Sequence, residues 1–395
     1  MDTNPPLSGI QVVSLEHAIA APLCTRQLAE LGARVIKVER RLNGDFARQY
    51  DDRARGLSSH FVWTNRGKQS MTLDLKHDRA ESILHRLLPG TDILVQNLAP
   101  SAAERIGLTY ELLSDRYPQL IVCNISGYGG SGPYAGKKAY DLLVQAEAGF
   151  LTVTGTPDEM VKSGISIADI AAGMQAHSAI LAALIKRART NEGSRIDISM
   201  LESMVEWMGF PLYYAYEGAP PPNRSGADHA SIYPYGAFRT GDQQTLMLGV
   251  QNDREWLAFC DLVLALPELA YDARFADNTG RSSNREELRA LILKQFANFT
   301  ARELEERLDR SKIAWARVNE MASVWEHPQL TALQRIVEID TPNGPIRSFR
   351  SPGNNNSYEP QAGAVPSLGE HTDSILTELG FNKTDIDQFR SEEVI

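Results

Sequence analysis

Short apolar runs alternate with helical patterns along the first third of the chain. Five runs rich in Val, Ile and Leu occur at 9–15, 33–39, 70–75, 91–98 and 119–126. Residues 22–32 carry leucines at roughly helical spacing and end on Gly32, and 78–88 predict another helix. Because strand, helix and strand follow within about 30 residues, the pattern indicates right-handed βαβ units. It therefore predicts an α/β fold with a mostly parallel sheet.

The pattern changes beyond residue 160. The stretch SGISIADIAAGMQAHSAILAALIKR (163–187) predicts a long Ala-rich helix, and residues 195–208 predict a strand that runs into a helix. Residues 217–236 are rich in Pro, Gly and Asn, which is typical of an irregular excursion. The segment FRTGDQQTLMLGV that follows predicts an antiparallel hairpin.

Amphipathic helices follow the hairpin, at about 253–265, 283–298 and 301–309. We expect capping boxes at the start of the last two, Ser283-x-x-Glu286 and Thr300-x-x-Glu303. The tail predicts two short helices, the first ending at Gly380. We expect a large α/β domain over residues 1–219, a small α+β domain over 220–330 and a C-terminal segment over 331–395.

Composition narrows the function classes. The chain has 395 residues, 43% of them hydrophobic and 23% charged, with a net charge of −10 and no basic tract. Nucleic acid and anionic membranes are therefore poor partners. The three cysteines lie far apart, without CxxC spacing, and the eight histidines show no HExxH motif, so we expect neither a disulfide framework nor a metal site. With no signal-peptide pattern at the start, we expect a cytoplasmic protein.

The motif GYGGSG (127–132) matches the G-x-G-x-x-G pattern of dinucleotide-binding loops and follows a predicted strand. However, Pro133, Gly136 and two lysines come next, where a helix should open on the last glycine. The first βα turn, SLEHAIAAPL, contains no glycine. The glycine fingerprint of dinucleotide-binding folds is therefore missing from the first βα turn, where it belongs. The glycines at 127–132 indicate instead a flexible loop or a close backbone approach to a ligand.

Several basic residues follow predicted strands or close the glycine loop. Each alone is typical of a solvated surface charge, but together they lie where open α/β sheets bind ligands, which indicates a phosphorylated ligand. They are Arg40, Arg41, Lys76, Arg105, Lys137 and Lys138.

Carboxylates are the best nucleophile candidates. The chain has no G-x-S-x-G elbow, and its cysteines fall in apolar runs, as structural cysteines do. Asp141 and Asp169 each come at a predicted helix start. Either carboxylate could serve as a helix N-terminal cap. Asp169, flanked by Ile and Ala, could instead be a nucleophile beside small residues that leave room for a ligand.

The chain resembles family III CoA-transferases, the group that includes formyl-CoA:oxalate and carnitine CoA-transferases. The resemblance is carried by LSGIQVVSLEHAIAAPLCTRQLAELGARVIKVERRLNGD, NRGKQSMTLDLK, DILVQNLAPSAAERIGL, SGYGGSGPYAGKKAYDLLVQAEAG, SIADIAAGMQAHSAILAAL and LGEHTDSIL, in family order. It implies a Rossmann-like large domain built from both chain ends, a small domain, and an interlocked homodimer.

The resemblance also implies the site. It places the nucleophilic aspartate on Asp169 rather than Asp141, with acyl-CoA as substrate and no permanently bound cofactor or metal. The implied CoA contacts are His17, Ala18, Arg40, Leu73, Lys76, Asn97, Leu98, Ala99, Arg105, Lys137, Lys138, Ala139 and Tyr140.

The expected reaction moves CoA from an acyl-CoA donor to a carboxylic acid through an aspartyl-CoA thioester. Alternatives are an α-methylacyl-CoA racemase and a non-catalytic CoA-binding protein. Racemases place a histidine where this chain has Tyr140, a poor base near neutral pH, which favours transfer. His229, Tyr233 and Tyr235 could line an acceptor pocket. Arg224 and Arg239 could bind a second carboxylate, as in a C4–C6 dicarboxylate such as succinate or mesaconate.

Overall fold

Two compact units make up the chain. The computed structural model describes residues 5–353 and 355–395. The first unit comprises the described residues up to Ala148, Ser163–Met208 and Pro328–Ile395, so it joins N-terminal and C-terminal parts of the chain. The second unit comprises Gly149–Lys162 and Gly209–His327.

The second unit includes two segments that the sequence analysis places in the large domain, 149–162 and 209–219. Hydrogen bonds to residues 224 and 226 explain why the segment 149–162 belongs to the second unit. The backbone N–H of Gly226 donates to the carbonyl of Gly155 over 2.7 Å, and the Arg224 guanidinium donates to the carbonyls of Thr156 and Pro157.

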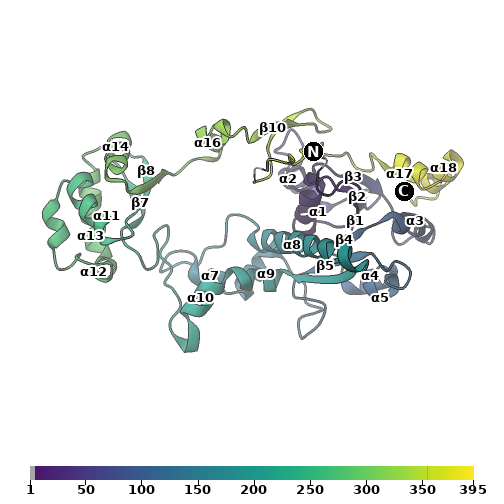
Figure 1. Ribbon diagram of the computed structural model, residues 1–395, viewed down its shortest axis with the longest axis horizontal. Helices are drawn as coiled ribbons and strands as arrows, with labels where there is room; N and C mark the ends of the chain where they lie inside the picture. The colour runs from purple at the N-terminus through teal and green to yellow at the C-terminus, as the bar shows by residue number, and fades with distance from the viewer. Residues whose placement is uncertain (1–4, 354) are drawn as a thin grey trace. The chain divides into compact units, whose positions relative to one another are not determined.

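A six-stranded parallel sheet of order β3-β2-β1-β4-β5-β6 forms the core of the first unit (Figure 1). Its strands are β1 Gln11–Leu15, β2 Arg34–Glu39, β3 Gln69–Thr72, β4 Ile93–Gln96, β5 Ile121–Ser126 and β6 Ser194–Ser199. The strand order reverses direction between β1 and β4, the switch point at which such sheets bind ligands. The predictions of an α/β fold and of a strand in each apolar run are confirmed.

Helices cover both faces of this sheet. Val13, Val38 and Leu94 share a hydrophobic cluster with residues of α3 (Ala80–Leu87), α17 (Thr372–Glu378) and α18 (Lys383–Ser391). Alternate strand residues point to the opposite face, where α1 (Ala20–Glu30) and α8 (Ile167–Thr190) contact the strands.

The long helix α8 packs closely on α1. Its buried positions are small, from Ala168 to Ala176, and Gly173 lies so near α1 that a Cβ there would be 2.6 Å from the carbonyl oxygen of Ala20. By length and composition alone α8 would pass as a membrane-crossing helix. In the first unit it contacts α1, β5, β6 and α9, and its buried residues face these elements.

The edge strand β3 is covered by residues some 300 positions later in the chain. The backbone N–H of His371 donates to the carbonyl of Ser70 over 2.9 Å, and the N–H of Thr72 donates to Thr372 Oγ1 over 3.0 Å. This blunts an otherwise open sheet edge. Just beyond β3, the N–H of Asp74 donates to the carbonyl of Val394.

The remaining elements of the first unit are short. Its helices and turns are η1 Phe46–Gln49, α2 Ser59–Asn65, η2 Leu88–Gly90, α4 Pro100–Arg105, α5 Tyr110–Leu113, α6 Asp141–Glu147, α9 Met200–Trp207 and α16 Pro328–Ala332. An antiparallel pair joins β10 Ile336–Ile339 to β11 Ile346–Phe349.

The second unit has its own hydrophobic core under a three-stranded antiparallel sheet. Its strands are β7 Tyr235–Arg239, β8 Thr245–Gly249 and β9 Ala314–Arg317. Its helices and turns are α7 Phe150–Val153, α10 Gly209–Tyr214, η3 Tyr216–Gly218, α11 Asp253–Ala258, η4 Phe259–Val263, η5 Pro267–Tyr271, α12 Asn278–Ser283, α13 Arg285–Phe296, α14 Ala301–Ser311 and α15 Met321–Val324. The predicted hairpin is confirmed as β7 and β8.

One of the two predicted capping boxes exists. Thr300 and Glu303 cap α14 reciprocally, as the spacing predicts. The box at Ser283 is wrong, because Ser283 is the last residue of α12 and the N-cap of α13 is Asn284, whose side chain makes no capping bond. The break between α12 and α13 at this point is not visible in the sequence pattern.

Candidate active site

Asp169 lies in the first turn of α8, three residues after the N-cap residue Ser166. The Ser166 side chain makes no capping hydrogen bond. The interpretation of Asp169 as the N-cap of this helix is therefore wrong. Its side chain is half-buried rather than solvated.

The cap of α8 comes instead from Asp141, at the first position of α6. Asp141 Oδ1 accepts the backbone N–H groups of Ala168 (2.7 Å) and Asp169 (3.2 Å). Asp141 Oδ2 accepts from Gln145 Nε2 over 2.6 Å, and Gln145 Oε1 accepts the N–H of Ser163 over 2.9 Å. Because both carboxylate oxygens are held in this way, Asp141 organises the start of α8 and is a poor nucleophile.

The carboxyl of Asp169 has an unusual protonation equilibrium. Burial, together with the negative charge of Asp141, raises the pKa of Asp169 to about 7, although the backbone N–H of Ala20 donates toward it and acts in the opposite direction. A carboxylate with a pKa near neutrality is more nucleophilic than an ordinary one and is still substantially ionised at pH 7. These are properties expected of a reacting group.

The loop after β1 carries Ala20 to this carboxylate. Its conformation is unusual, because Ala18 has a φ of +65°. The side-chain amide of Asn97, just after β4, holds His17 at both backbone groups: Oδ1 accepts the His17 N–H over 3.1 Å, and Nδ2 donates to the His17 carbonyl over 2.9 Å. The predicted site residues His17, Ala18 and Asn97 therefore meet at the switch point of the sheet.

The other predicted CoA positions cluster at the same edge of the sheet where they follow β2, β3 and β4. Arg40 and Lys76 follow β2 and β3, and the Lys76 side chain is exposed. Leu73 is only 1% exposed, so any ligand contact from it must come from its backbone. Leu98 and Ala99 lead into α4, and Arg105 is the exposed last residue of that helix.

The segment 137–140 leads directly into α6, with Tyr140 as its N-cap residue. Lys138 and Tyr140 are exposed, and Ala139 is partly buried. The Lys137 ammonium is engaged within the chain, since it pairs with Glu147 and lies 4.2 Å from the Tyr134 ring centroid and 5.0 Å from that of Tyr128. A phosphate bound there would compete with Glu147.

The glycine motif has a packing explanation. A Cβ on Gly127 would lie 2.0 Å from the Cβ of Ala139, so the motif's first glycine lets the segment before α6 approach β5. Gly129 and Gly132 have φ of +97° and +84°, which side chains disfavour. The motif therefore shapes the loop that holds Lys137.

Cysteine chemistry is absent from the described residues of the site. Cys24, Cys123 and Cys260 are all free and buried. Burial raises the pKa of the Cys123 and Cys260 thiols to about 12 and raises that of Cys24 as well. Thiols in this state are poor nucleophiles.

Comparison with known proteins identifies the family. The family model described as CoA-transferase family III matches residues 7–372. This chain belongs to CoA-transferase family III. The predicted enzyme class is thereby confirmed.

Relatives of this family III CoA-transferase match it over nearly their whole lengths. An acyl-CoA transferase of Fusarium pseudograminearum is 33% identical over 98% of this chain and 88% of its own. A succinate–glutarate CoA-transferase of Agrobacterium fabrum is 33% identical over 95% of this chain and 96% of its own. The crystal structure of a CAIB/BAIF family protein from Brucella suis superposes with a TM-score of 0.86 and 32% identity, covering 95% of this chain and all of the other.

The residues predicted to bind the acceptor lie in the second unit of the transferase, and one of them is inaccessible. Tyr233 is fully buried in that unit's core, so its prediction as a pocket residue is wrong. His229 and Tyr235 stack with ring centroids 5.2 Å apart. The guanidinium of Arg224 donates to two backbone carbonyls, and Arg239 is exposed on β7.

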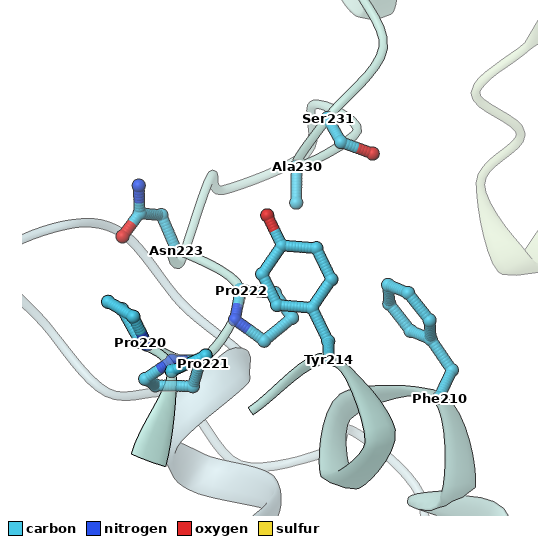
Figure 2. A pocket seen from close by; sticks show the side chains of 9 residues that line it. Phe210, Tyr214, Pro220, Pro221, Pro222, Asn223, Ala230 and Ser231 are labelled. Carbon is cyan, nitrogen blue, oxygen red and sulfur yellow. The ribbon is translucent and has the colours of Figure 1, made fainter. Parts of the chain in front are cut away.

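A cavity of about 420 Å³ also lies in the second unit. Figure 2 shows that aromatic rings of α10 and a run of prolines line it, and the described lining carries no charged side chain. The lining residues are Phe210, Tyr214, Ala219, Pro220, Pro221, Pro222, Asn223, Ala230 and Ser231. It therefore lacks a built-in partner for a carboxylate.

Sequence reasoning missed a buried charge cluster beneath the loop after β1. Glu16 Oε1 accepts from Lys68 Nζ over 2.7 Å, and Lys37 Nζ donates to Asp45 Oδ2 over 2.7 Å. Burial alone would raise the pKa of Glu16, but Lys68 and Lys37 lower it overall. The available signal was Lys37 inside an apolar strand, since a lysine buried there requires an acidic partner.

Proposed function

We propose that this CoA-transferase moves CoA from an acyl-CoA to a dicarboxylic acid through a thioester on Asp169. The observation that carries the proposal is the Asp169 carboxyl itself. It is half-buried, it has a pKa of about 7, and it lies between the first turn of α8 and the backbone N–H of Ala20.

The chemistry proceeds by four acyl exchanges that balance without a net proton. An oxygen of ionised Asp169 attacks the thioester carbonyl, and the C–S bond breaks to release CoA thiolate and leave a mixed anhydride. The thiolate attacks the aspartyl carbonyl, which forms aspartyl-CoA and releases the donor acid. The acceptor carboxylate then attacks aspartyl-CoA, and the thiolate released attacks the acceptor's acyl carbonyl. The products are the new acyl-CoA and free Asp169.

The main chain supplies what the tetrahedral intermediates need. Negative charge develops on the aspartyl oxygen when thiolate or carboxylate attacks Asp169, and the Ala20 N–H already points toward this group. Small buried residues of α8, Ala168, Ala171 and Ala172, let α1 and its first N–H group, that of Ala20, come close to the first turn of α8. Asp141 keeps the first turn of α8 in place while the carbonyl carbon changes geometry.

We assign CoA binding to the loops at the carboxyl ends of β1 to β4 and to the segment 137–140. Their cations suit the phosphates of CoA, and the sequence resemblance places CoA contacts on the same residues. Relatives support a dicarboxylate acceptor, because their names include succinyl-CoA:glutarate, succinyl-CoA:mesaconate and succinyl-CoA–D-citramalate CoA-transferase.

We also propose that the enzyme works as an interlocked homodimer with a large and a small domain. The family resemblance supports this, and so do apolar side chains exposed on α8 and α9, such as Met174, Ile185 and Trp207. Light scattering coupled to size exclusion should report twice the 43.7 kDa chain mass. A monomer with full transferase activity would contradict this part of the proposal.

Intact-mass spectrometry tests the reaction. The enzyme is incubated with succinyl-CoA alone, and we expect a covalent CoA adduct that hydroxylamine removes and that maps to Asp169. Asp169→Asn should form none, and labelled glutarate or mesaconate should become its CoA ester only with the wild type. Deuterium incorporation at the α-carbon of a 2-methylacyl-CoA without an adduct would indicate a racemase. Binding without either result would indicate a CoA-binding protein.

A further inference from the structure

The turn between β1 and α1 holds a conformation that its own sequence disfavours. Ala18 lies in the left-handed region with φ +65°, where a side chain is strained and glycine is the ordinary choice. The next residue, Ile19, is the N-cap residue of α1 and makes no side-chain capping bond. External contacts must therefore hold this turn in place.

Asp45 is the side chain that holds the strained residue. Its Oδ1 accepts the backbone N–H of Ala18 over 3.1 Å and that of Ala47 over 2.9 Å. Its Oδ2 accepts from Lys37 Nζ over 2.7 Å, and its own N–H donates to Glu39 Oε1 over 3.0 Å. The carboxylate is thus fixed at each oxygen and at the backbone.

Lys37 makes this anchor rigid. The ammonium is fully buried on β2, where an unpaired charge would be very costly. Asp45 is its nearest partner, and Glu16 lies 3.5 Å away. The pair therefore has little freedom to relax, and the position of the Asp45 carboxylate follows from the position of β2 in the sheet.

The turn delivers a backbone donor to the reacting carboxylate. Two residues after Ala18, the N–H of Ala20 donates toward Asp169. The far side of Ala20 is also fixed, because its carbonyl oxygen lies where a Cβ on Gly173 would approach to 2.6 Å. Rotation of Ala18 out of the left-handed region would re-aim this N–H.

We propose that Asp45, anchored by Lys37, is a positioning residue for CoA transfer, since it holds the Ala18 turn so that the Ala20 N–H faces Asp169. The inference rests on the proposed function of Asp169. Asp45 itself touches neither substrate nor the reacting atoms, and acts through the main chain of residues 18–20.

The test compares Asp45→Asn with wild type in single-turnover formation of aspartyl-CoA from succinyl-CoA, over a range of pH. If the Ala20 N–H no longer points at Asp169, one hydrogen-bond donor to the oxyanion is lost. The maximal rate should then fall roughly 10- to 100-fold, with a smaller change in KM. The acidic limb of the rate profile should move to higher pH, because the Ala20 N–H otherwise lowers the pKa of Asp169. Deleting a nearby negative charge without moving the turn would shift the limb to lower pH or leave it in place.

The matched control is Asp51→Asn. Asp51 also accepts backbone N–H groups, those of Arg53 and Ser59, but none from the turn itself. The acidic limb of the pH–rate profile of Asp51→Asn should match that of the wild type, and so should its maximal rate. If Asp45→Asn behaves like this control while Asp169→Asn is inactive, the positioning inference is wrong and the proposed function stands. If Asp169→Asn remains active, the proposed function fails.

A second variant keeps the inference testable should Asp45→Asn not fold. Ala18→Val leaves the buried pair intact but places a β-branched side chain at positive φ, which drives the turn out of the left-handed region. We expect the same loss of maximal rate and the same upward shift of the limb. In the converse test, Ala18→Gly combined with Asp45→Asn should recover about tenfold in rate, since glycine adopts the turn without strain. Unchanged kinetics in Ala18→Val would overturn the inference.

Discussion

Replacing Asp169 by Asn should abolish transfer and at the same time stabilise the first unit. The pKa of this carboxyl is raised from 3.8 to about 7, chiefly by burial and also by Asp141. The native state therefore binds the proton more tightly than the unfolded chain does. At about 1.4 kcal/mol per unit, ionisation of Asp169 at pH 8 costs the fold up to about 4 kcal/mol, and we expect about 2–4 kcal/mol because the side chain is half-buried.

Because the pKa of Asp169 is raised in the native state, the stability difference between Asp169→Asn and the wild type should depend on pH. Below pH 4 the carboxyl is protonated in both states, so Asp169→Asn should be as stable as the wild type. Between pH 4 and pH 7 the unfolded wild type gives up the proton while the native state keeps it, and the wild type loses stability relative to the variant. Above pH 7 the full difference should be present.

Urea unfolding followed by circular dichroism, at intervals from pH 4 to pH 8, measures this difference. Asp141→Ala is the matched comparison, since it removes the cap of α8 and should destabilise the fold by about 0.5–2 kcal/mol. Without the Asp141 charge, the pKa of Asp169 should also fall. An Asp169→Asn difference that does not vary with pH, or a wild type more stable than the variant at pH 8, would refute the reasoning.

Three further outcomes are expected. The rate of aspartyl-CoA formation should fall as the pH drops below about 7, since protonation of Asp169 removes the nucleophile; a rate that stays constant down to pH 5 would contradict this assignment. Gly173→Ala places a Cβ 2.6 Å from the Ala20 carbonyl and should destabilise the fold by about 1–3 kcal/mol, measured by urea unfolding, whereas an unchanged midpoint would show that the helices yield. Glu147→Gln frees Lys137 and should lower KM for acyl-CoA about two- to fivefold at low salt, with Lys137→Ala raising it; a KM insensitive to both changes would remove Lys137 from the binding site.

Much of the fold was predictable because its signals are local. Strand runs such as 33–39 are continuous in sequence, and the capping box at Thr300 needs only four residues. The cap of α8 was not predictable in this way, since Asp141 lies 28 residues before Asp169 and reaches it only through tertiary packing. The false box at Ser283 fails for a related reason, because a helix that ends and a helix that begins look continuous in sequence.

In the candidate site, too, features carried by local motifs could be predicted, whereas features that depend on tertiary contacts could not. The sequence resemblance could place Asp169 and the cations at strand ends, because these follow recognisable motifs. It could not reveal that Ala18 has positive φ or that Asp45 holds it, since an alanine carries no mark of its backbone conformation. Lys37 and Glu39, charged residues inside the apolar strand β2, were the local signs that a buried polar cluster lies beneath the loop.

Coverage of β3 by the last helices has a consequence for synthesis. Residues 371–394, which complete the edge and one face of the sheet, leave the ribosome about 300 residues after β3. At roughly 5–20 residues per second, the apolar face that α17 and α18 will cover stays open for roughly 15–60 s. During that time the open face of the nascent sheet can bind chaperones, and the first unit can complete its core only once residues 371–394 have been synthesised.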